Sequence, residues 1–301
     1  MRFILQYPET NGTSRDMLDA GPLDEVAAAA EKAGFDAISL TEHPVPGAQW
    51  LETGGHQSLD PFVGLAFAAA ATTTLRLMTS LVVAPYHNPF QLAKAAATVD
   101  KLSGGRLILG MGTGYQKSEF FALGVDLAER AALFDEALDV LPLHWSGEPF
   151  SYKGLHFDAR DVIARPKPVQ DPIPIWVGGN SGRARRRAAE KGQGWLPMIA
   201  SSEVAATAQT MAITSREQLA TLIQGVKDAA AAAGRPGPLD FTSFYTDPTL
   251  AAAPTADADR HRETWAELEK IGVTWLSISC HSTSREETFD FIEAFGGTYL
   301  S

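Results

Sequence analysis

The feature that most constrains this chain is a regular alternation of short apolar runs with longer, alanine-rich stretches of helical spacing. Near-continuous apolar strands that alternate with helices indicate a parallel sheet buried on both faces. Eight such units in 301 residues predict an α/β fold, a (β/α)8 TIM barrel. The apolar runs are 2–7, 36–41, 75–83, 106–110, 173–178, 194–198, 239–245 and 273–279, and the helical stretches lie near 21–33, 60–73, 89–102, 127–145, 182–191, 215–233, 256–271 and 284–295.

The chain reads as a single domain over residues 1–301, with insertions after the fourth helix and the sixth strand. The first insertion, about 146–172, is proline-rich and contains a small strand pair. The second, about 199–214, is either a lid or a surface insertion without a role. A doubly wound sheet is the alternative fold. It would place a glycine fingerprint after the first strand, and the sequence "QYPETNGTS" there is not one.

Composition narrows the class of partner. The net charge is -11 and the pI is near 5.1, which disfavours nucleic acid and anionic membranes. No stretch approaches the roughly 18 apolar residues of a membrane span, and the first residues do not follow the order of a secretion signal, so we expect a cytoplasmic enzyme. The single cysteine, Cys280, lies in an apolar run and is expected to be buried as a small hydrophobic residue. The sequence contains no cluster of His or Cys residues with metal-ligand spacing, so we expect no metal site.

In a barrel, residues just past the strand ends converge on one pocket. After the second strand come Glu42 and His43, a carboxylate and an imidazole suited to acid–base chemistry. After the third strand, His87 is expected to be a loop or capping residue. Four aromatic residues are expected to line a substrate cleft or to belong to the core: Trp50, Phe62, Tyr115 and Trp195. His56 is expected either to cover the pocket from a loop or to be exposed and idle.

Two glycine-rich turns suit a phosphate. The stretch "ILGMGTGYQKSEF" ends the fourth strand with the spacing G-x-G-x-G, and Gly112, Thr113 and Gly114 leave bare backbone amides there. The fifth strand ends in "IWVGGNSGRARRR", where glycines, Asn180 and Ser181 open a helix, and most of the arginines that follow are expected to form a solvated face. Tight turns without a ligand are the alternative. Because two neighbouring turns can each bind a phosphate, we expect the pocket to hold a phosphorylated cofactor.

These motifs together resemble the bacterial-luciferase-like superfamily of flavin- and deazaflavin-dependent oxidoreductases. The most characteristic blocks are "HNPFQLAKAAATVDKLSGGRLILGMGTG" and "RPKPVQ…PIWVGG". The resemblance implies a TIM barrel, a non-proline cis peptide at Ser80–Leu81 beneath the cofactor ring, and a proton-donor role for His43 with Glu42 beside it. The cofactor-binding residues predicted on this basis are Ser80, Leu81, Val83, Gly112, Thr113, Gly114, Tyr115, Ser118, Gly178, Gly179, Asn180 and Ser181.

The resemblance also implies a cofactor and a reaction. Sugar-phosphate dehydrogenases of the superfamily have a glutamate where this chain has Tyr115, which argues against that substrate. Bacterial luciferase has an arginine at the position of Thr113, and the absence of that arginine favours coenzyme F420 over FMN. We therefore expect F420-dependent hydride transfer with a small organic substrate. The alternatives are an FMNH2-dependent monooxygenase supplied by a separate reductase, and a non-catalytic flavin-binding barrel. Many relatives form homodimers through the helices after strands 2 and 3, and the same is expected here.

Overall fold

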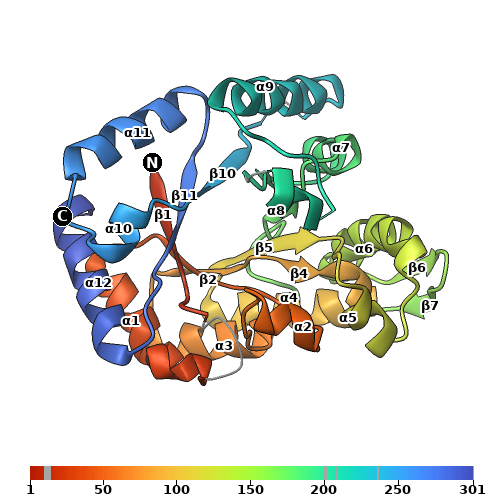
Figure 1. The fold of residues 1–301 in the computed structure, drawn as a ribbon. Helices are drawn as coiled ribbons and strands as arrows, with labels where there is room; N and C mark the ends of the chain where they lie inside the picture. Colours follow the sequence, from red (N-terminus) through yellow and green to blue (C-terminus); the bar gives the residue numbers. More distant parts are fainter. Residues whose placement is uncertain (10–14, 200–201, 208, 236, 301) are drawn as a thin grey trace.

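The strands form one closed barrel in the computed structural model, which describes residues 1–9, 15–199, 202–207, 209–235 and 237–300. All the barrel pairings are parallel, and the last strand pairs with the first, so the sheet has no open edge (Figure 1). This confirms the predicted (β/α)8 barrel. Its strands, in spatial order, are β1 (Arg2–Gln6), β2 (Ala37–Leu40), β3 (Arg76–Thr79), β5 (Leu107–Gly112), β8 (Ile175–Gly178), β9 (Gly194–Leu196), β10 (Asp240–Tyr245) and β11 (Trp275–Ser279).

The barrel helices begin where the sequence places their caps. The side chains of Asp60, Asn88 and Ser215 each accept a hydrogen bond from a first-turn amide, which satisfies one of the donors left unpaired at a helix start. The helices pack around the outside of the strands (Figure 1). They are α1 (Leu23–Ala33), α3 (Pro61–Ala71), α4 (Pro89–Ser103), α6 (Arg130–Trp145), α7 (Gly182–Glu190), α9 (Arg216–Ala232), α11 (Ala258–Lys270) and α12 (Arg285–Tyr299).

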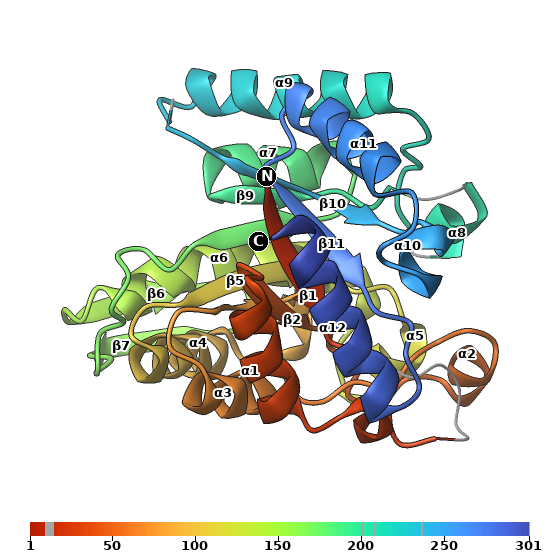
Figure 2. The same cartoon turned by 90° about the vertical axis from the view of Figure 1, so that its left-hand side faces the viewer.

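The loops that follow the strands contain short helices that the sequence pattern does not reveal. Figure 2 shows α2 (Ala48–Glu52), α5 (Lys117–Ala122), α8 (Ser202–Thr207) and α10 (Pro248–Ala252) gathered at one end of the barrel, where the strands finish. We call this end the mouth. Three 3-10 turns complete the loops: Met17–Ala20, Ala84–Tyr86 and Leu127–Glu129.

The two predicted insertions lie at opposite ends. The insertion at 146–172 contains the expected antiparallel pair, β6 (Phe150–Lys153) and β7 (Asp158–Val162), at the end away from the mouth (Figure 2). The insertion at 199–214 follows β9 and contributes α8 at the mouth. Residues 200, 201 and 208 of this second insertion are outside the described ranges.

Three predicted element boundaries are wrong. The run 75–83 is not one strand, because the cis peptide Ser80–Leu81 separates β3 from β4 (Val82–Val83), which pairs again with β5. The resemblance predicted this cis bond. The strand predicted at 106–110 extends to Gly112, and the helix predicted from 127 begins as a 3-10 turn before α6 starts at Arg130.

The barrel interior is filled unevenly along its axis. A layer of buried apolar side chains blocks the part of the barrel near the starts of the strands, including Trp176 and Trp275, whose rings lie 5.3 Å apart. Side chains alternate along a strand, so the next inward positions toward the mouth are the small polar residues Ser39 and Ser277. Outside the strands, the helices cover a second and larger apolar layer, to which Cys280 belongs, as predicted. Burial raises the pKa of the Cys280 thiol to about 11.

Candidate active site

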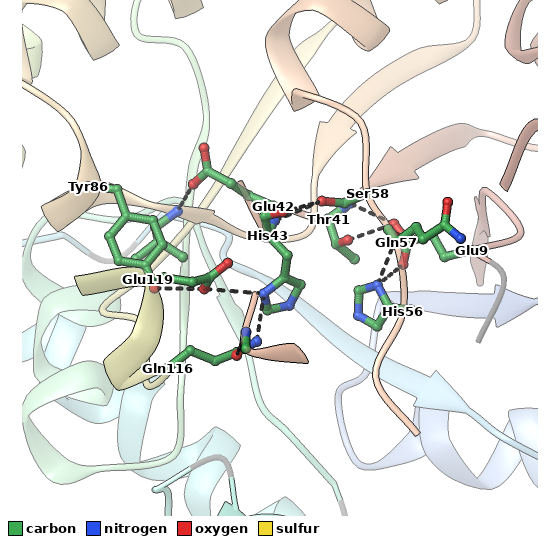
Figure 3. Close-up of polar contacts among 12 residues, drawn as sticks. Glu9, Thr41, Glu42, His43, His56, Gln57, Ser58, Tyr86, Gln116 and Glu119 are labelled. Atoms are coloured by element: carbon green, nitrogen blue, oxygen red, sulfur yellow. Dashed lines mark hydrogen bonds and ion pairs between the residues drawn. The ribbon is translucent and has the colours of Figure 1, made fainter. Parts of the chain in front are cut away.

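His43, just past the end of β2, lies at the centre of a polar cluster at the mouth (Figure 3). Its side chain is only 10% exposed, and its Nδ1 lies 3.0 Å from Gln116 Nε2 and 3.3 Å from Glu119 Oε2. The His43 amide donates to Ser58 Oγ at 2.8 Å, which fixes the backbone of the loop. His43 Nε2 has no hydrogen-bond partner within the described part of the chain, so this nitrogen is free to exchange a proton with a ligand.

Glu119 supplies the carboxylate beside His43, and sequence reasoning missed it. It lies on α5, one helical turn beyond Tyr115, and its side chain is 1% exposed. Tyr86 donates its hydroxyl to Glu119 Oε2 at 2.9 Å, whereas Glu119 Oε1 has no partner among the described residues. Burial and the charge of Glu119 both raise the pKa of Tyr86, which therefore remains a proton donor.

Glu42 faces away from His43 and joins two strands. Its Oε2 accepts the amide of Val83 at 2.5 Å, and its Oε1 lies 2.8 Å from Nε2 of His87. His87 is a loop residue that caps the 3-10 turn Ala84–Tyr86, as expected, and its ring in addition pairs with this buried carboxylate. The predicted catalytic role of Glu42 stays a prediction. Its contacts hold the backbone of β4, just after the cis peptide.

A second imidazole–carboxylate pair lies next to the first. Glu9, after β1, accepts the amide and hydroxyl of Thr41 at 3.1 and 2.6 Å, and its other oxygen lies 3.0 Å from His56 Nδ1 (Figure 3). The rings of His56 and His43 are 4.9 Å apart, and Trp50 lies against both. Burial alone lowers the pKa of His56, but the hydrogen bond and charge of Glu9 outweigh it and raise that pKa. His56 is thus neither exposed nor idle.

The cis peptide and both glycine-rich turns meet beside this cluster. The Leu81 side chain lies between the inner faces of β5 and β8, where a Cβ on Gly112 or on Gly178 would come within 2.9 or 2.4 Å of Leu81 Cδ1. Only glycine at these two positions leaves room for Leu81. The structure therefore brings together Ser80, Leu81 and the ends of two strands far apart in sequence.

The turn after β5 presents free amides. None of the amides of Thr113, Gly114 and Tyr115 donates a hydrogen bond within the described residues. Gly114 has a φ of +72°, and a Cβ there would come within 2.6 Å of the Val83 side chain, so the turn requires glycine. Ser118 is exposed on α5 and faces Gly47 of the loop after β2. This turn retains the donors that an anion needs.

The turn after β8 is already partly bonded to the protein. The amides of Gly179 and Asn180 donate to the Leu196 carbonyl and to Thr210 Oγ1. Asn180 is completely buried, and its side chain bonds the backbone of Met198 and Met211, which anchors the insertion after β9. Ser181 caps α7 through its hydroxyl. Among the described residues the amides of Ser181, Gly182 and Arg183 donate no hydrogen bond and are thus the free donors of this turn. The cofactor contacts predicted for Gly178 to Ser181 stay predictions.

Other predicted side chains divide between the cleft and the core. Trp50 and Tyr115 lie beside His43, with ring centroids 4.6 and 6.3 Å from it. The side chain of Trp195 is fully buried on the outer face of β9, among the apolar residues beneath the helices. Its indole N–H donates to the Gly179 carbonyl, so Trp195 does not line a cleft. Phe62 is 8% exposed and belongs to the same apolar layer.

Most of the arginines on α7 are exposed or half-buried, as expected, and Arg187 is the exception. Arg187 is 6% exposed, pairs with Asp135 at 2.5 Å and lies over the Phe134 ring. Arg183 also pairs with Asp135, from an exposed position. These arginines therefore attach α7 to α6.

Buried hydroxyls inside the mouth lack partners. Ser39 Oγ and Ser277 Oγ are inaccessible to solvent and form no hydrogen bond with the described residues. Buried polar atoms are rarely left unpaired in a protein. Together with the free amides after β5 and the small residues facing Leu81, they fit a site for a polar, anion-tailed ring cofactor.

Two surface hollows do not include the cluster around His43, although loops of the mouth at Ile199, Thr214 and Thr246 line part of the first. One of about 330 Å³ lies between α9 and α11 beside Arg216 and Arg260, and one of about 640 Å³ lies between α4 and the β6–β7 hairpin beside Arg160. All three arginines already pair with carboxylates. Within the described ranges no three His, Cys, Asp or Glu side chains gather as a metal site, and no helix is both long and apolar enough to cross a membrane.

Comparison with known proteins gives one family. The sequence model of the luciferase-like monooxygenases matches residues 1–270. The F420-dependent glucose-6-phosphate dehydrogenase of Beutenbergia cavernae is 36% identical over 174 residues, which cover 56% of this chain and 49% of that protein. This match therefore spans about half the length of the relative.

Two further proteins match over more of the chain. The F420-dependent glucose-6-phosphate dehydrogenase of Kineococcus radiotolerans is 30% identical over 248 residues, covering 79% of this chain and 68% of that protein. The crystal structure of monooxygenase RslO1 from Streptomyces bottropensis superposes with a TM-score of 0.75 over 100% of this chain and 99% of its own, at 24% identity. That structural likeness shows the shared barrel fold.

Proposed function

The chain belongs to the luciferase-like monooxygenase family and is thus an enzyme of that class. We propose that it uses coenzyme F420 to transfer a hydride to or from a small organic substrate. The relatives named as F420-dependent support the cofactor. The observation that carries the reaction is the setting of His43. Its Nδ1 is held by Gln116 and Glu119, and its Nε2 is free at the mouth near the cis peptide.

The residues present fit the cofactor. The amides of Thr113, Gly114 and Tyr115 and the first turn of α7 would hold its phosphate, and the bulge at Ser80–Leu81 would support its ring. When bound, the deazaflavin supplies or accepts the hydride, which is the chemistry the side chains cannot provide. The protein then contributes orientation and control of the proton.

His43 is suited to move that proton. In the oxidising direction the substrate hydroxyl gives its proton to Nε2 as its carbon loses the hydride, and in the reducing direction Nε2 returns the proton to the carbonyl oxygen. The carboxylate of Glu119, 3.3 Å from Nδ1, stabilises the imidazolium that forms. Tyr86 holds that carboxylate in place through its hydroxyl. Glu119 thus supplies a carboxylate to a site where superfamily dehydrogenases have one directly after the glycine turn.

A titration of the protein with F420 and with FMN, followed by fluorescence quenching, tests the proposal. F420 is expected to bind more tightly than FMN, and hydride transfer should proceed without oxygen uptake. Tight FMN binding with oxygen uptake would instead support the monooxygenase, which needs reduced FMN from a separate reductase. Cofactor binding without turnover of any substrate would support the non-catalytic barrel.

A variant localises the cofactor tail. Gly179 has a φ of +100°, so Gly179→Ala strains the turn after β8 and is expected to weaken F420 binding about tenfold. Gly104→Ala is the matched control, because Gly104 also has a positive φ, +72°, but ends α4 away from the mouth. If both variants bind F420 as the wild type does, the turn after β8 does not hold the cofactor.

A homodimer and a cytoplasmic location belong to the same proposal. The face formed by α3 and α4 exposes Val63 at 71%, Phe67 at 56% and Leu102 at 71%. These are the helices after strands 2 and 3, through which superfamily members pair, and adjacent exposed apolar side chains are typical of an interface. Sedimentation of the wild type as a dimer and of Phe67→Glu as a monomer would support this interface, whereas a monomeric wild type would contradict it.

A further inference from the structure

The mouth pairs every one of its three buried carboxylates with a histidine. The pairs are Glu9 with His56 at 3.0 Å, Glu42 with His87 at 2.8 Å, and Glu119 with His43 at 3.3 Å. The carboxylate side chains are at most 5% exposed, so little solvent screens them. When all three histidines are protonated the cluster is neutral, and with any histidine neutral it is negative. The cluster therefore never presents a net positive charge to a substrate.

The loops around the mouth add almost no cations. In sequence, the segments 41–60, 80–88, 197–215 and 246–257 contain neither lysine nor arginine. The segments after β1 and β5 contribute Arg15 and Lys117, both exposed. Arg15 donates to the Thr283 carbonyl rather than to the cluster. The segments after β8 and β11 lead into Arg183, Arg185 and Arg285, of which Arg183 and Arg285 pair with Asp135 and Glu25. Arg185 lies in the first turn of α7, where the cofactor phosphate is proposed to bind. Among the described residues no lysine or arginine pairs with Glu9, Glu42 or Glu119, so a phosphorylated or carboxylated substrate would enter beside carboxylates that no lysine or arginine neutralises.

The groups that remain unsatisfied at the mouth are one carboxylate oxygen and two neutral hydroxyls. Within the described residues Glu119 Oε1 is buried and accepts no hydrogen bond, and the hydroxyls of Ser39 and Ser277 are buried and unpaired. A carboxylate oxygen in such a position accepts a substrate O–H and repels an anion. The rings of Trp50 and Tyr115 beside His43 offer flat apolar surface.

We propose that the substrate is an uncharged alcohol or carbonyl compound that carries neither phosphate nor carboxylate. The proposal rests on the proposed hydride-transfer function and names its substrate class. It separates this chain from the relatives named glucose-6-phosphate dehydrogenases, whose named substrate carries a phosphate.

Matched pairs of ligands test this directly. Calorimetric binding to the full chain, with and without F420, is measured for glucose and glucose 6-phosphate, glycerol and glycerol 3-phosphate, and cyclohexanol and cyclohexyl phosphate; turnover is followed in parallel. The uncharged member is expected to bind at least about tenfold more tightly in each pair that binds. Tighter or equal binding of a phosphorylated member, or binding by no uncharged member, overturns the proposal.

The same experiment separates the two proposals. Failure of F420 to bind overturns the proposed function, while the preference measured without F420 still decides the substrate class. Binding of F420 with a preference for phosphorylated ligands overturns the substrate class and leaves the cofactor assignment intact.

A charge variant identifies the source of the preference. Glu9→Gln removes one carboxylate but keeps an acceptor for Thr41, so the preference for the uncharged member should shrink several-fold. Glu148→Gln, at an exposed position after α6, is the control and should change nothing. If Glu9→Gln does not fold, His56→Gln removes the cation of the same pair and should widen the preference. An unchanged preference in the folded variant overturns the electrostatic explanation.

Discussion

The two ends of the barrel use the same strands but fill them with different chemistry. Where the strands begin, Arg2 bonds Asp240 at 2.7 Å and lies 4.2 Å above the ring of Trp275, which in turn packs on Trp176. Where the strands finish, the inward positions include small residues such as Ser39, Gly112 and Ser277, and acids, histidines and aromatic rings are contributed by loops.

The difference shows how one fold separates stability from function. The large apolar side chains at the first end bury surface and find neighbours on all sides, which stabilises the closed sheet. The mouth leaves hydroxyls and amides without hydrogen bonds among the described residues, which lowers the stability of the unliganded protein. A ligand that bonds these groups would offset that loss. We therefore expect substitutions at the two ends to affect different measurements.

The largest effect is expected from His43→Ala. Removing a positioned proton carrier lowers turnover by about 10²- to 10⁴-fold, and the affinity for F420 should stay within a few-fold, because the cofactor tail binds elsewhere. Steady-state kinetics and F420 fluorescence titration measure the two quantities. His156→Ala is the control, since His156 is 45% exposed and pairs with Glu129 rather than with a residue of the cluster around His43. Unchanged turnover in His43→Ala would remove this residue from the mechanism.

The next effect is expected at the opposite end, in stability. Trp176 is 1% exposed among apolar neighbours, so Trp176→Ala should lower the free energy of unfolding by about 3–5 kcal/mol in urea. Trp50→Ala is the matched control at the mouth. Trp50 is half-buried beside His43, so the Trp50→Ala variant should lose turnover while its free energy of unfolding changes little. If Trp50→Ala destabilises as much as Trp176→Ala, the mouth is part of the core and the contrast between the two ends is wrong.

The sequence predicts the barrel well because its signal is repeated along the chain. Each strand is a short apolar run, and each long helix has a capping residue such as Asp60 or Ser215 that local chemistry makes recognisable. The break between β3 and β4 gives no such signal, since Thr79 and Ser80 lie between apolar residues in a run that contains no glycine or proline. The resemblance to a family predicted it, and hydrophobic periodicity did not.

The site was predicted in part, because half of each pair comes from a distant segment. His43 and Glu42 were recognisable at a strand end, but Glu119 lies 76 residues from His43, on a helix of six residues that is too short to show a period. Its position four residues after Tyr115 was the available signal. Asn180 was predicted to contact the cofactor because its side chain carries an amide donor. Only the fold shows that this amide donates instead to the backbone of a neighbouring loop.

The smallest effect is expected from a pH-dependent contact at the end away from the mouth. Glu31, on α1, accepts the amides of Thr73, Thr74 and Leu75, just before β3 begins. Burial opposes its charge, but these hydrogen bonds outweigh burial and lower the pKa of Glu31 from 4.5 to about 2. Because the pKa is lower in the folded state, the contribution is complete above the unfolded value and is lost as the pH falls from 4.5 toward 2.

Glu31→Gln should therefore lower the free energy of unfolding by about 1 kcal/mol near pH 6, after allowance for solvent screening of a partly exposed group. The difference from the wild type should shrink as the pH approaches the folded pKa, because the wild-type carboxyl is then also uncharged. Urea unfolding at a series of pH values measures this difference, with Glu148→Gln as an exposed control. A difference that stays constant across the series would show that Glu31 acts through packing, and that the carboxylate charge does not stabilise the turn into β3.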